Sequence, residues 1–348
     1  LIDNSLFDKQ WVDEAREKDV QVTNNAYAAP ITPLAINFNT ISLAVVANKD
    51  KSVSVALDPL PLSHVIIRNQ VKILPPKSKP TLRVTRMAQK DEREIVVVTG
   101  GVPADGVIRR FYRATSVPQR MAGEVIRAFF EAGGIRLRGV VESGVVKKDD
   151  KLLYTWRGKS LAEILRGLNL FSNNLIADLL VKRLGVFAHG KGKHLEMSDL
   201  SAGVNIIKHF VVNKAMHVKT PLHLVDGSGL DRRNRVSSSQ LVSLLAYMAG
   251  RFDLFPEYMS SLPTAGKTGS LSFRFGDRFQ GAATIRAKTG TLVQKPIISS
   301  LAGYLHHKDH GLVAFSVIYN GRNGVQQPSL HTLHALQENG IARFRTVL

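Results

Sequence analysis

A strand pattern near the C-terminal end constrains the fold of this chain more than any other segment. The run Thr284–Val293 is rich in β-branched residues and carries Lys288-Thr289-Gly290-Thr291. Two further strand patterns follow, Ile298–Leu305 and Leu312–Tyr319, and the polar turn between them is typical of a β-hairpin. Because a hairpin joins antiparallel strands, the sequence predicts an antiparallel sheet in this region.

Helix patterns precede and follow these strands. A capping box at Ser160 opens one helix pattern, and an apolar stripe over Leu175–Gly185 predicts another. The triplet Ser172-Asn173-Asn174 lies between the two. Further helix patterns cover about 199–213, 238–249 and 329–338. Residues 146–348 are therefore expected to form one α/β domain, with an antiparallel sheet flanked by helices.

The first 145 residues differ in character, because most of their patterns indicate strands. Short segments rich in β-branched residues are bounded by Lys, Asp, Pro or Gly, and they cover 41–47, 53–57, 82–86 and 94–99. One helix pattern follows, with Ser116 and Gln119 as its capping box and an apolar stripe from Met121 to Phe130. The sequence thus predicts a multi-domain protein in which residues 1–145 form one or two β-rich modules.

Composition excludes several classes of function. The chain contains no cysteine, so disulfides, thiolate catalysis and cysteine-bound metals are ruled out. Lys and Arg number 47 against 28 Asp and Glu, a net charge of +19 that favours anionic partners such as nucleic acid, anionic lipid or an acidic cell-wall polymer. A solvated basic surface without a specific partner explains the same excess. No apolar run reaches the roughly 18 residues of a membrane-spanning helix.

The polar residues of the two motifs suit recognition of an anionic group. A lysine on a strand directs its ammonium to one face, and the hydroxyls of Thr289 and Thr291 lie beside Lys288, which suits capture of a carboxylate. Gly290 allows close approach of a ligand backbone. Ser172 and Asn174 can project from the turn between two helices into a cleft. The simpler alternatives are a solvated edge-strand lysine and a serine that caps a helix.

Three other features are assigned structural interpretations. A second Lys-Thr-Gly, at Lys267, follows a turn rather than a strand pattern, so Lys288 is predicted to be the functional lysine. The glycine-spaced loop Asp226–Asn234 lacks the setting of a phosphate-binding loop and is interpreted as a tight loop stabilised by Asp226. The eleven histidines show no metal-binding spacing, so neither a metal nor another cofactor is expected.

A Ser-x-Asn triplet followed by Lys-Thr-Gly matches two of the three active-site motifs of the penicillin-recognising serine enzymes. With the other segments in their order, the chain resembles the D-alanyl-D-alanine carboxypeptidase/endopeptidase family of the penicillin-binding protein 4 type. These segments are Leu1–Phe7, Ser172–Asp178, Asp226–Leu230, Leu262–Leu271 and Ala287–Leu292. One departure is Thr268, where the family usually has an acidic residue.

The third family motif, Ser-x-x-Lys, does not occur in the 348 residues. In the family it lies upstream of the position that corresponds to Leu1. The resemblance therefore leads us to expect that this chain is a fragment, and that the nucleophile and a signal peptide precede it. Inserted β-rich modules of the family would account for the first 145 residues.

The resemblance implies a serine D-Ala-D-Ala carboxypeptidase or DD-endopeptidase that cleaves peptidoglycan peptides through an acyl-enzyme and is inhibited by β-lactams. Ser172 would transfer a proton toward the leaving amine, Asn174 would hold the acyl side-chain amide, and Lys288 would stabilise the negative end of the substrate. Thr289–Thr291 would bind the carboxylate, and the Thr291 N–H would supply half of an oxyanion hole. The expected location is periplasmic or exported, with peripheral membrane or cell-wall association left open.

Two other classes of function remain as alternatives. The first is a peptidoglycan-binding scaffold that uses the same cleft and has lost its nucleophile. The second is a nucleic-acid-binding protein, which only the positive charge supports. No basic stretch is interleaved with aromatic residues as single-strand binders require, so a nucleic-acid partner is not expected. The oligomeric state and the preference between carboxypeptidase and endopeptidase substrates are left open by the sequence.

Overall fold

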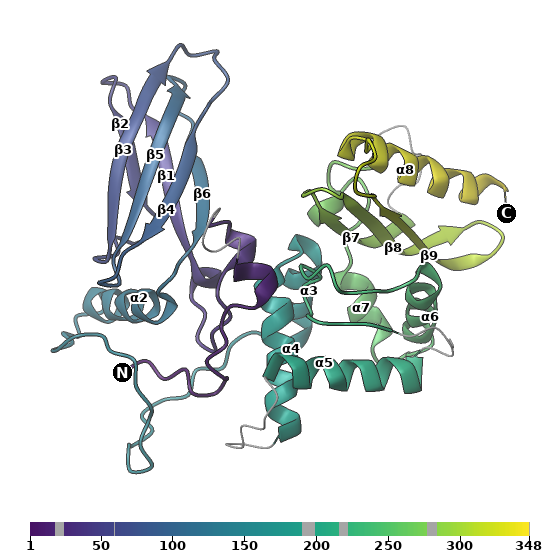
Figure 1. Ribbon diagram of the computed structural model, residues 1–348, viewed down its shortest axis with the longest axis horizontal. Coiled ribbons are helices and arrows are strands. Elements are labelled where there is room, and N and C mark those ends of the chain that lie inside the picture. Colours follow the sequence, from purple (N-terminus) through teal and green to yellow (C-terminus); the bar gives the residue numbers. More distant parts are fainter. Residues whose placement is uncertain (18–23, 59, 190–198, 216–221, 277–283, 348) are drawn as a thin grey trace. The chain divides into compact units, whose positions relative to one another are not determined.

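The computed structural model describes the chain except for residues 18–23, 59, 190–198, 216–221, 277–283 and 348 (Figure 1). It divides into two compact units. Unit 1 consists of Leu1–Leu153 with His189–Asp199, and unit 2 consists of Tyr154–Ala188 with Leu200–Leu348. The correspondence of each unit to a module of the penicillin-binding protein 4 type stays a prediction.

Unit 1 contains two three-stranded sheets, with strand orders β2-β1-β6 and β3-β5-β4. Strand β1 pairs antiparallel with both neighbours, and β5 pairs antiparallel with β4 and parallel with β3. Helix α2 (Pro118–Ala132) follows the last strand. The strands are β1 (Thr40–Ala47), β2 (Val53–Leu57), β3 (Val65–Leu74), β4 (Arg83–Ala88), β5 (Glu94–Pro103) and β6 (Arg109–Ala114).

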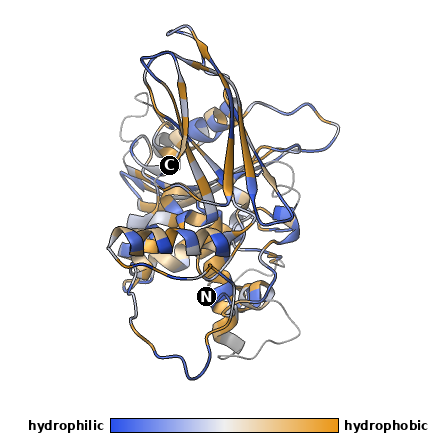
Figure 2. Ribbon diagram, turned by 90° about the vertical axis from the view of Figure 1, so that its left-hand side faces the viewer, coloured by the Kyte–Doolittle hydropathy of each residue, from blue (hydrophilic) through white to orange (hydrophobic). Residues whose placement is uncertain are grey.

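The core of unit 1 forms where alternate residues of these strands point inward. Leu43 and Val45 of β1, Val96 and Val98 of β5, and Met121 of α2 belong to one buried cluster. Hydrophobic and hydrophilic segments accordingly follow one another along the strands (Figure 2). The sequence patterns did not identify β3 and β6, because their solvent-facing positions carry long polar side chains that obscure the alternation.

A network of buried charges joins the strands and α2 in unit 1. Glu94 is fully buried, accepts hydrogen bonds from Arg86 (3.0 Å) and Thr115 (2.8 Å), and lies 3.5 Å from Nε2 of His64. Nδ1 of His64 lies 3.0 Å from Glu124 of α2. Burial opposes ionisation of Glu94, but its partners outweigh this effect and lower its pKa.

The same network overturns one predicted helix cap. Helix α2 exists as predicted, but it has no side-chain cap, and Val117 stands at its N-cap position. Ser116 instead donates its backbone N–H and its hydroxyl to Glu94, at 2.7 Å and 2.9 Å. A buried carboxylate is a stronger acceptor than the capping geometry offers, so the local signal was misleading here.

Unit 2 is built on the antiparallel sheet that the sequence predicts. Strands β7 (Ile285–Leu292), β8 (Ile298–His307) and β9 (Gly311–Asn320) lie in that order, and both pairs are antiparallel. Ile341 of α8 (Leu330–Val347) joins a core cluster on one face with Ala287 and Leu301. On the other face Tyr304 packs with Leu245, a residue of α6 (Ser238–Ala249), and with α7 (Phe255–Ser261). The prediction of an antiparallel sheet flanked by helices is confirmed.

The remaining helices lie before this sheet in the chain. The predicted capping box at Ser160 is present and opens α3 (Leu161–Phe171). Helices α4 (Asn174–His189) and α5 (Asp199–Phe210) follow, and a π-helical turn covers Val211–Ala215. The predicted ends of two helices were wrong, because α4 continues past Gly185 and α8 passes through Gly340. A glycine inside a helix costs only about 1 kcal/mol, which tertiary packing can outweigh. None of the described helices combines the length and apolarity needed to cross a membrane.

Candidate functional site

Ser172 occupies a left-handed turn between two helices of unit 2. It is the C-cap of α3, with φ +54°, and its N–H donates to the Leu168 carbonyl. The cap of the following helix is Asn173, whose Oδ1 accepts from the N–H of Ile176 at 3.0 Å. The alternative of Ser172 as a helix N-cap is therefore wrong. Its hydroxyl is exposed and available to other groups, and Asn174 begins α4 directly after the turn.

Lys288 reaches this hydroxyl from strand β7. Its Nζ donates to Ser172 Oγ at 2.6 Å and to the Thr289 carbonyl at 2.7 Å. Burial lowers the pKa of the Lys288 amine to about 8, because an apolar environment disfavours the charged form. The structure thus brings Ser172 and Lys288 into direct contact. Lys267 makes no such contact and is exposed in its turn.

Strand β7 is an edge strand, and its free edge faces the segment before it. Ala265 donates its N–H to the Ile285 carbonyl at 3.0 Å, and Ala287 donates to the Pro263 carbonyl at the same distance. Hydrogen-bonding direction alternates along an antiparallel strand, so the N–H groups of Thr289 and Thr291 also point away from β8. Beyond Ala287, the described residues form no backbone hydrogen bond with this edge. A peptide could therefore pair with it.

Gly290 lies against the neighbouring strand, whereas the sequence predicted close approach of a ligand backbone. A Cβ built on Gly290 would lie 2.5 Å from the hydroxyl oxygen of Ser300, its partner on β8. That hydroxyl donates to the Gly290 carbonyl at 3.4 Å. Packing within the sheet explains why position 290 has no side chain. The ligand-binding role predicted for Gly290 stays a prediction.

Ser270 joins the site although the sequence patterns did not single it out. It follows the second Lys-Thr-Gly, in a short 3-10 helix (Gly269–Leu271), and accepts a hydrogen bond from Thr289 Oγ1 at 2.7 Å. Thr268 also has a structural partner, since its hydroxyl accepts from the Thr264 N–H at 2.9 Å. The one sequence signal for Ser270 was the repeated Lys-Thr-Gly triplet that precedes it. In the structure this repeat places a hydroxyl residue, and not a second lysine, beside β7.

The Asp226 loop connects the two sides of the site. Asp226 accepts from the N–H groups of Gly229 and Asp231, both at 2.8 Å, as the structural interpretation requires. Asp178 of α4 accepts from the loop N–H of Gly227 at 2.7 Å. Arg232 donates to the carbonyls of Gln294 (2.7 Å) and Pro296 (2.8 Å), which connect β7 with β8. The loop therefore supports both α4 and the end of β7.

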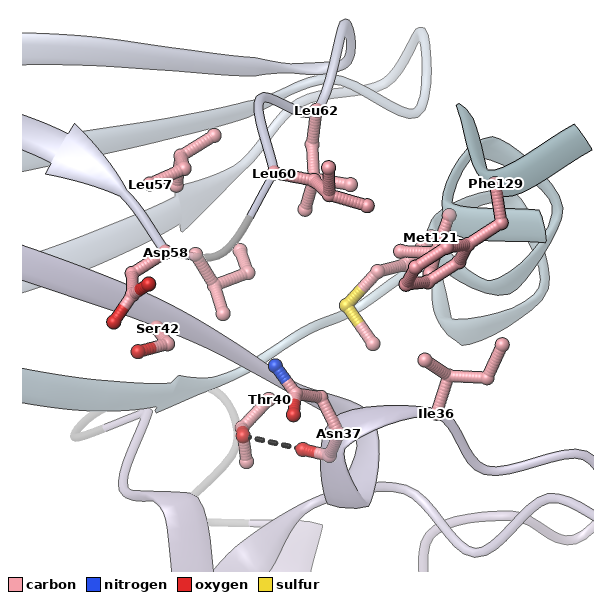
Figure 3. Close-up of a pocket in the computed structure, with 12 residues that line it drawn as sticks. Ile36, Asn37, Thr40, Ser42, Leu57, Asp58, Leu60, Leu62, Met121 and Phe129 are labelled. Carbon is pink, nitrogen blue, oxygen red and sulfur yellow. Dashed lines mark hydrogen bonds between the residues drawn. The ribbon is translucent and has the colours of Figure 1, made fainter. Parts of the chain in front are cut away.

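A hollow in unit 1 has Met121 and Phe129 of α2 on one side and Leu57 and Leu62 on the other (Figure 3). Among its described lining residues the only carboxylate is Asp58, which accepts from Arg110 at 2.8 Å. No three His, Asp or Glu side chains of the described residues are placed to hold a metal ion.

Proteins similar to this chain are carboxypeptidases by name. The sequence profile described as the D-Ala-D-Ala carboxypeptidase 3 (S13) family matches residues 1–337. A D-alanyl-D-alanine carboxypeptidase of Actinomadura sp. (strain R39) is 32% identical over 237 residues, which are 66% of this chain and 42% of that protein. The D-alanyl-D-alanine carboxypeptidase DacB of Haemophilus influenzae is 27% identical over 201 residues, which are 58% of this chain and 40% of that protein.

The fold has a counterpart among solved structures. The crystal structure of penicillin binding protein 4 (dacB) from Haemophilus influenzae matches with a TM-score of 0.72 at 20% sequence identity, covering 98% of this chain and 73% of that chain. At this identity the likeness shows the fold alone, and it confirms the multi-domain α/β prediction. The chain spans about half the length of the curated relatives it matches.

Proposed function

Because the chain belongs to the D-Ala-D-Ala carboxypeptidase 3 (S13) family, we propose that unit 2 is the substrate-binding part of a serine D-Ala-D-Ala carboxypeptidase that acts on peptidoglycan peptides. The observation that carries the proposal is the 2.6 Å hydrogen bond from Lys288 to Ser172. It joins the two motifs across 116 positions of sequence. The proposal extends to cleavage of cross-linked peptides, to inhibition by β-lactams and to a location outside the cytoplasm, where peptidoglycan lies.

The geometry supports recognition of a substrate with a free C-terminal carboxylate. The Lys288 ammonium supplies positive charge, and Thr289 and Thr291 supply hydroxyls beside it. The substrate backbone would pair with the open edge of β7, with the Thr291 N–H turned toward its carbonyl. A donor aimed at a developing oxyanion typically contributes about 3 kcal/mol of transition-state stabilisation.

The proposed reaction is acyl transfer with a nucleophile that this chain does not contain. A serine in a Ser-x-x-Lys motif, supplied upstream of Leu1, attacks the carbonyl of the penultimate D-Ala and forms an acyl-enzyme. Ser172 passes a proton to the leaving amine, which departs as D-Ala, and water then releases the acyl group. Lys288 holds the Ser172 hydroxyl in place, and its lowered pKa suits proton exchange near neutral pH. Asn174 binds the acyl side-chain amide.

A fluorescent penicillin tests the proposal on two polypeptides, the 348 residues alone and the same chain extended by its upstream coding sequence. We expect a covalent label that survives denaturation only on the extended protein. In that protein Lys288→Ala should slow acylation by about 100-fold, the effect of losing about 3 kcal/mol. Lys267→Ala is the matched control, since Lys267 is exposed and makes no contact with Ser172, and it should stay within about twofold.

Three results would contradict parts of the proposal. A stable label on the 348 residues alone would mean that the nucleophile lies within them, with Ser172 the first residue to replace. An extended protein that refuses the label would favour the peptidoglycan-binding scaffold. Equal losses for Lys288→Ala and Lys267→Ala would show that the site lies elsewhere.

A further inference from the structure

Ser270 is held beside β7 by the packing of its own turn. Thr289 Oγ1 donates to Ser270 Oγ at 2.7 Å. The next residue, Leu271, is fully buried in the core cluster that contains Ile285 and Ala287 of β7. The side chain of Ser270 is itself exposed. A buried neighbour therefore fixes the position of a hydroxyl that solvent and ligands can reach.

The same turn lies against the end of α3. Gly269 has φ +57°, and a Cβ built on it would lie 2.4 Å from the carbonyl oxygen of Leu170. Only glycine tolerates both this backbone conformation and this approach. Leu170 precedes Ser172 by two residues, so Ser270 is placed between the segment that carries Ser172 and the strand that carries Lys288.

The hydroxyl groups at this site differ in the hydrogen bonds that they already make. The hydroxyl of Thr289 donates to Ser270. The ammonium of Lys288 donates to the Ser172 hydroxyl and to the Thr289 carbonyl. Among the described residues, no acceptor takes the proton of Ser270. Because Ser270 already accepts one hydrogen bond, its own proton is polarised and becomes a better donor. Ser172 and Ser270 therefore each keep a hydroxyl proton that an incoming anion can accept, and in Ser270 that proton is polarised by the hydroxyl of Thr289.

The geometry points to Ser270 as a specificity-determining residue that donates to the C-terminal carboxylate of the substrate. Thr289 polarises the Ser270 hydroxyl, and Lys288 supplies the positive charge. This assignment rests on the proposed function and sharpens it, because it gives the second Lys-Thr-Gly triplet a role through the serine that follows it. The ligand class is a peptide with a free terminal carboxylate. A peptide that is amidated at its C-terminus loses both the charge and the strong acceptor.

The test uses the 348-residue chain and two probes, an N-acetylated peptide ending in D-Ala-D-Ala and the same peptide amidated at its C-terminus. Chemical-shift titration measures both dissociation constants, and their ratio reports carboxylate recognition. Ser270→Ala should reduce the preference for the carboxylate by about tenfold, the effect of one lost hydrogen bond to a charged group. Ser270→Thr keeps the hydroxyl and should restore the preference. Ser272→Ala, in the same segment, is the matched control and should leave the ratio unchanged.

The outcomes separate this inference from the proposed function. If Lys288→Ala abolishes the preference but Ser270→Ala leaves it intact, the role of Ser270 is overturned and the proposed function stands. If the unaltered chain binds the two peptides equally, the proposed function is overturned, and the assignment of Ser270 with it. If Ser270→Ala and Ser272→Ala reduce the ratio equally, the effect comes from the turn rather than from the hydroxyl, and the assignment is wrong.

Discussion

The two units each contain a cluster of charged and hydroxyl side chains, and the clusters differ in how fully their hydrogen-bonding capacity is used. In unit 1, Glu94 is inaccessible to solvent and is surrounded by Arg86, Thr115 and Ser116. In unit 2, Ser172 and Ser270 are exposed, and each has received a single hydrogen bond from strand β7. A buried carboxylate with both oxygens hydrogen-bonded stabilises a fold, whereas an exposed cluster with spare donors can bind a ligand.

The largest effect is expected where the buried cluster is broken. Glu94→Gln should destabilise unit 1 by about 3 kcal/mol, because it leaves the buried guanidinium of Arg86 without its counter-ion. Asp91→Asn breaks an exposed ion pair with Arg93 and should leave stability nearly unchanged. Urea denaturation followed by circular dichroism measures both variants. Similar small losses for the two would mean that the buried cluster is not required for stability.

The open cluster should respond to pH through ligand binding. The pKa of Lys288 is lowered to about 8, so a bound carboxylate loses its ammonium partner above that pH. Affinity for the carboxylate peptide should then fall by about tenfold per pH unit above 8. Lys288→Arg keeps its charge and should bind with little change up to pH 10. An affinity that stays constant through this range in the unaltered chain would show that the lysine charge is not used.

The stability effect of Lys288 has the opposite direction with pH. Between its lowered pKa of about 8 and its ordinary value of 10.5, the unfolded chain binds more protons than the folded chain. The free energy of unfolding therefore rises with pH across this window. Comparison of the unaltered chain with Lys288→Met by urea denaturation at pH 7 and pH 10 isolates this contribution.

The buried cluster should respond to pH through stability alone. Burial opposes the charged form of His64, but contacts with Glu124 and Glu94 outweigh it and raise the pKa of the imidazole. Such a group stabilises the fold fully below pH 6.5 and loses this contribution as pH rises through the raised pKa. We expect a loss of the order of 1 kcal/mol in unit 1. Thermal unfolding measures it, and His64→Gln should remove the pH dependence. A stability that rises over the same range would contradict the assignment.

The smallest effects separate helix stability from site geometry. Asn173→Ala removes the cap of α4 beside Ser172, and Ser160→Ala removes the cap of α3 at its distant end. Each should cost about 1 kcal/mol. Only Asn173→Ala should also weaken binding of the carboxylate peptide, because only that cap adjoins Ser172. Equal effects of both variants on affinity would show that the turn geometry is not specific to the site.

Local signals explain which elements were predictable. The hairpin of β8 and β9 has strong β-branched strands and a polar turn, and the capping box of α3 satisfies two backbone donors within four residues. Strand β3 was missed because it carries polar side chains on its solvent face. The cap predicted at Ser116 failed because Glu94, 22 residues away, binds its hydroxyl instead. The missed cap involves a partner that is distant in sequence, whereas the missed strand lacks a clear alternation of its own.

By itself the sequence determined the antiparallel sheet of unit 2, the helices around it and the two motifs that contain Ser172 and Lys288, because these depend on periodicity and turn chemistry within short windows. The strand pattern around Lys288 also favoured this lysine over Lys267. Only the tertiary structure decided that Lys288 donates to Ser172, that Asn173 caps α4, and that Ser270 receives a hydrogen bond from Thr289. These contacts span up to 116 positions. They depend on how the core places one segment against another, and no local pattern of residues encodes that distance.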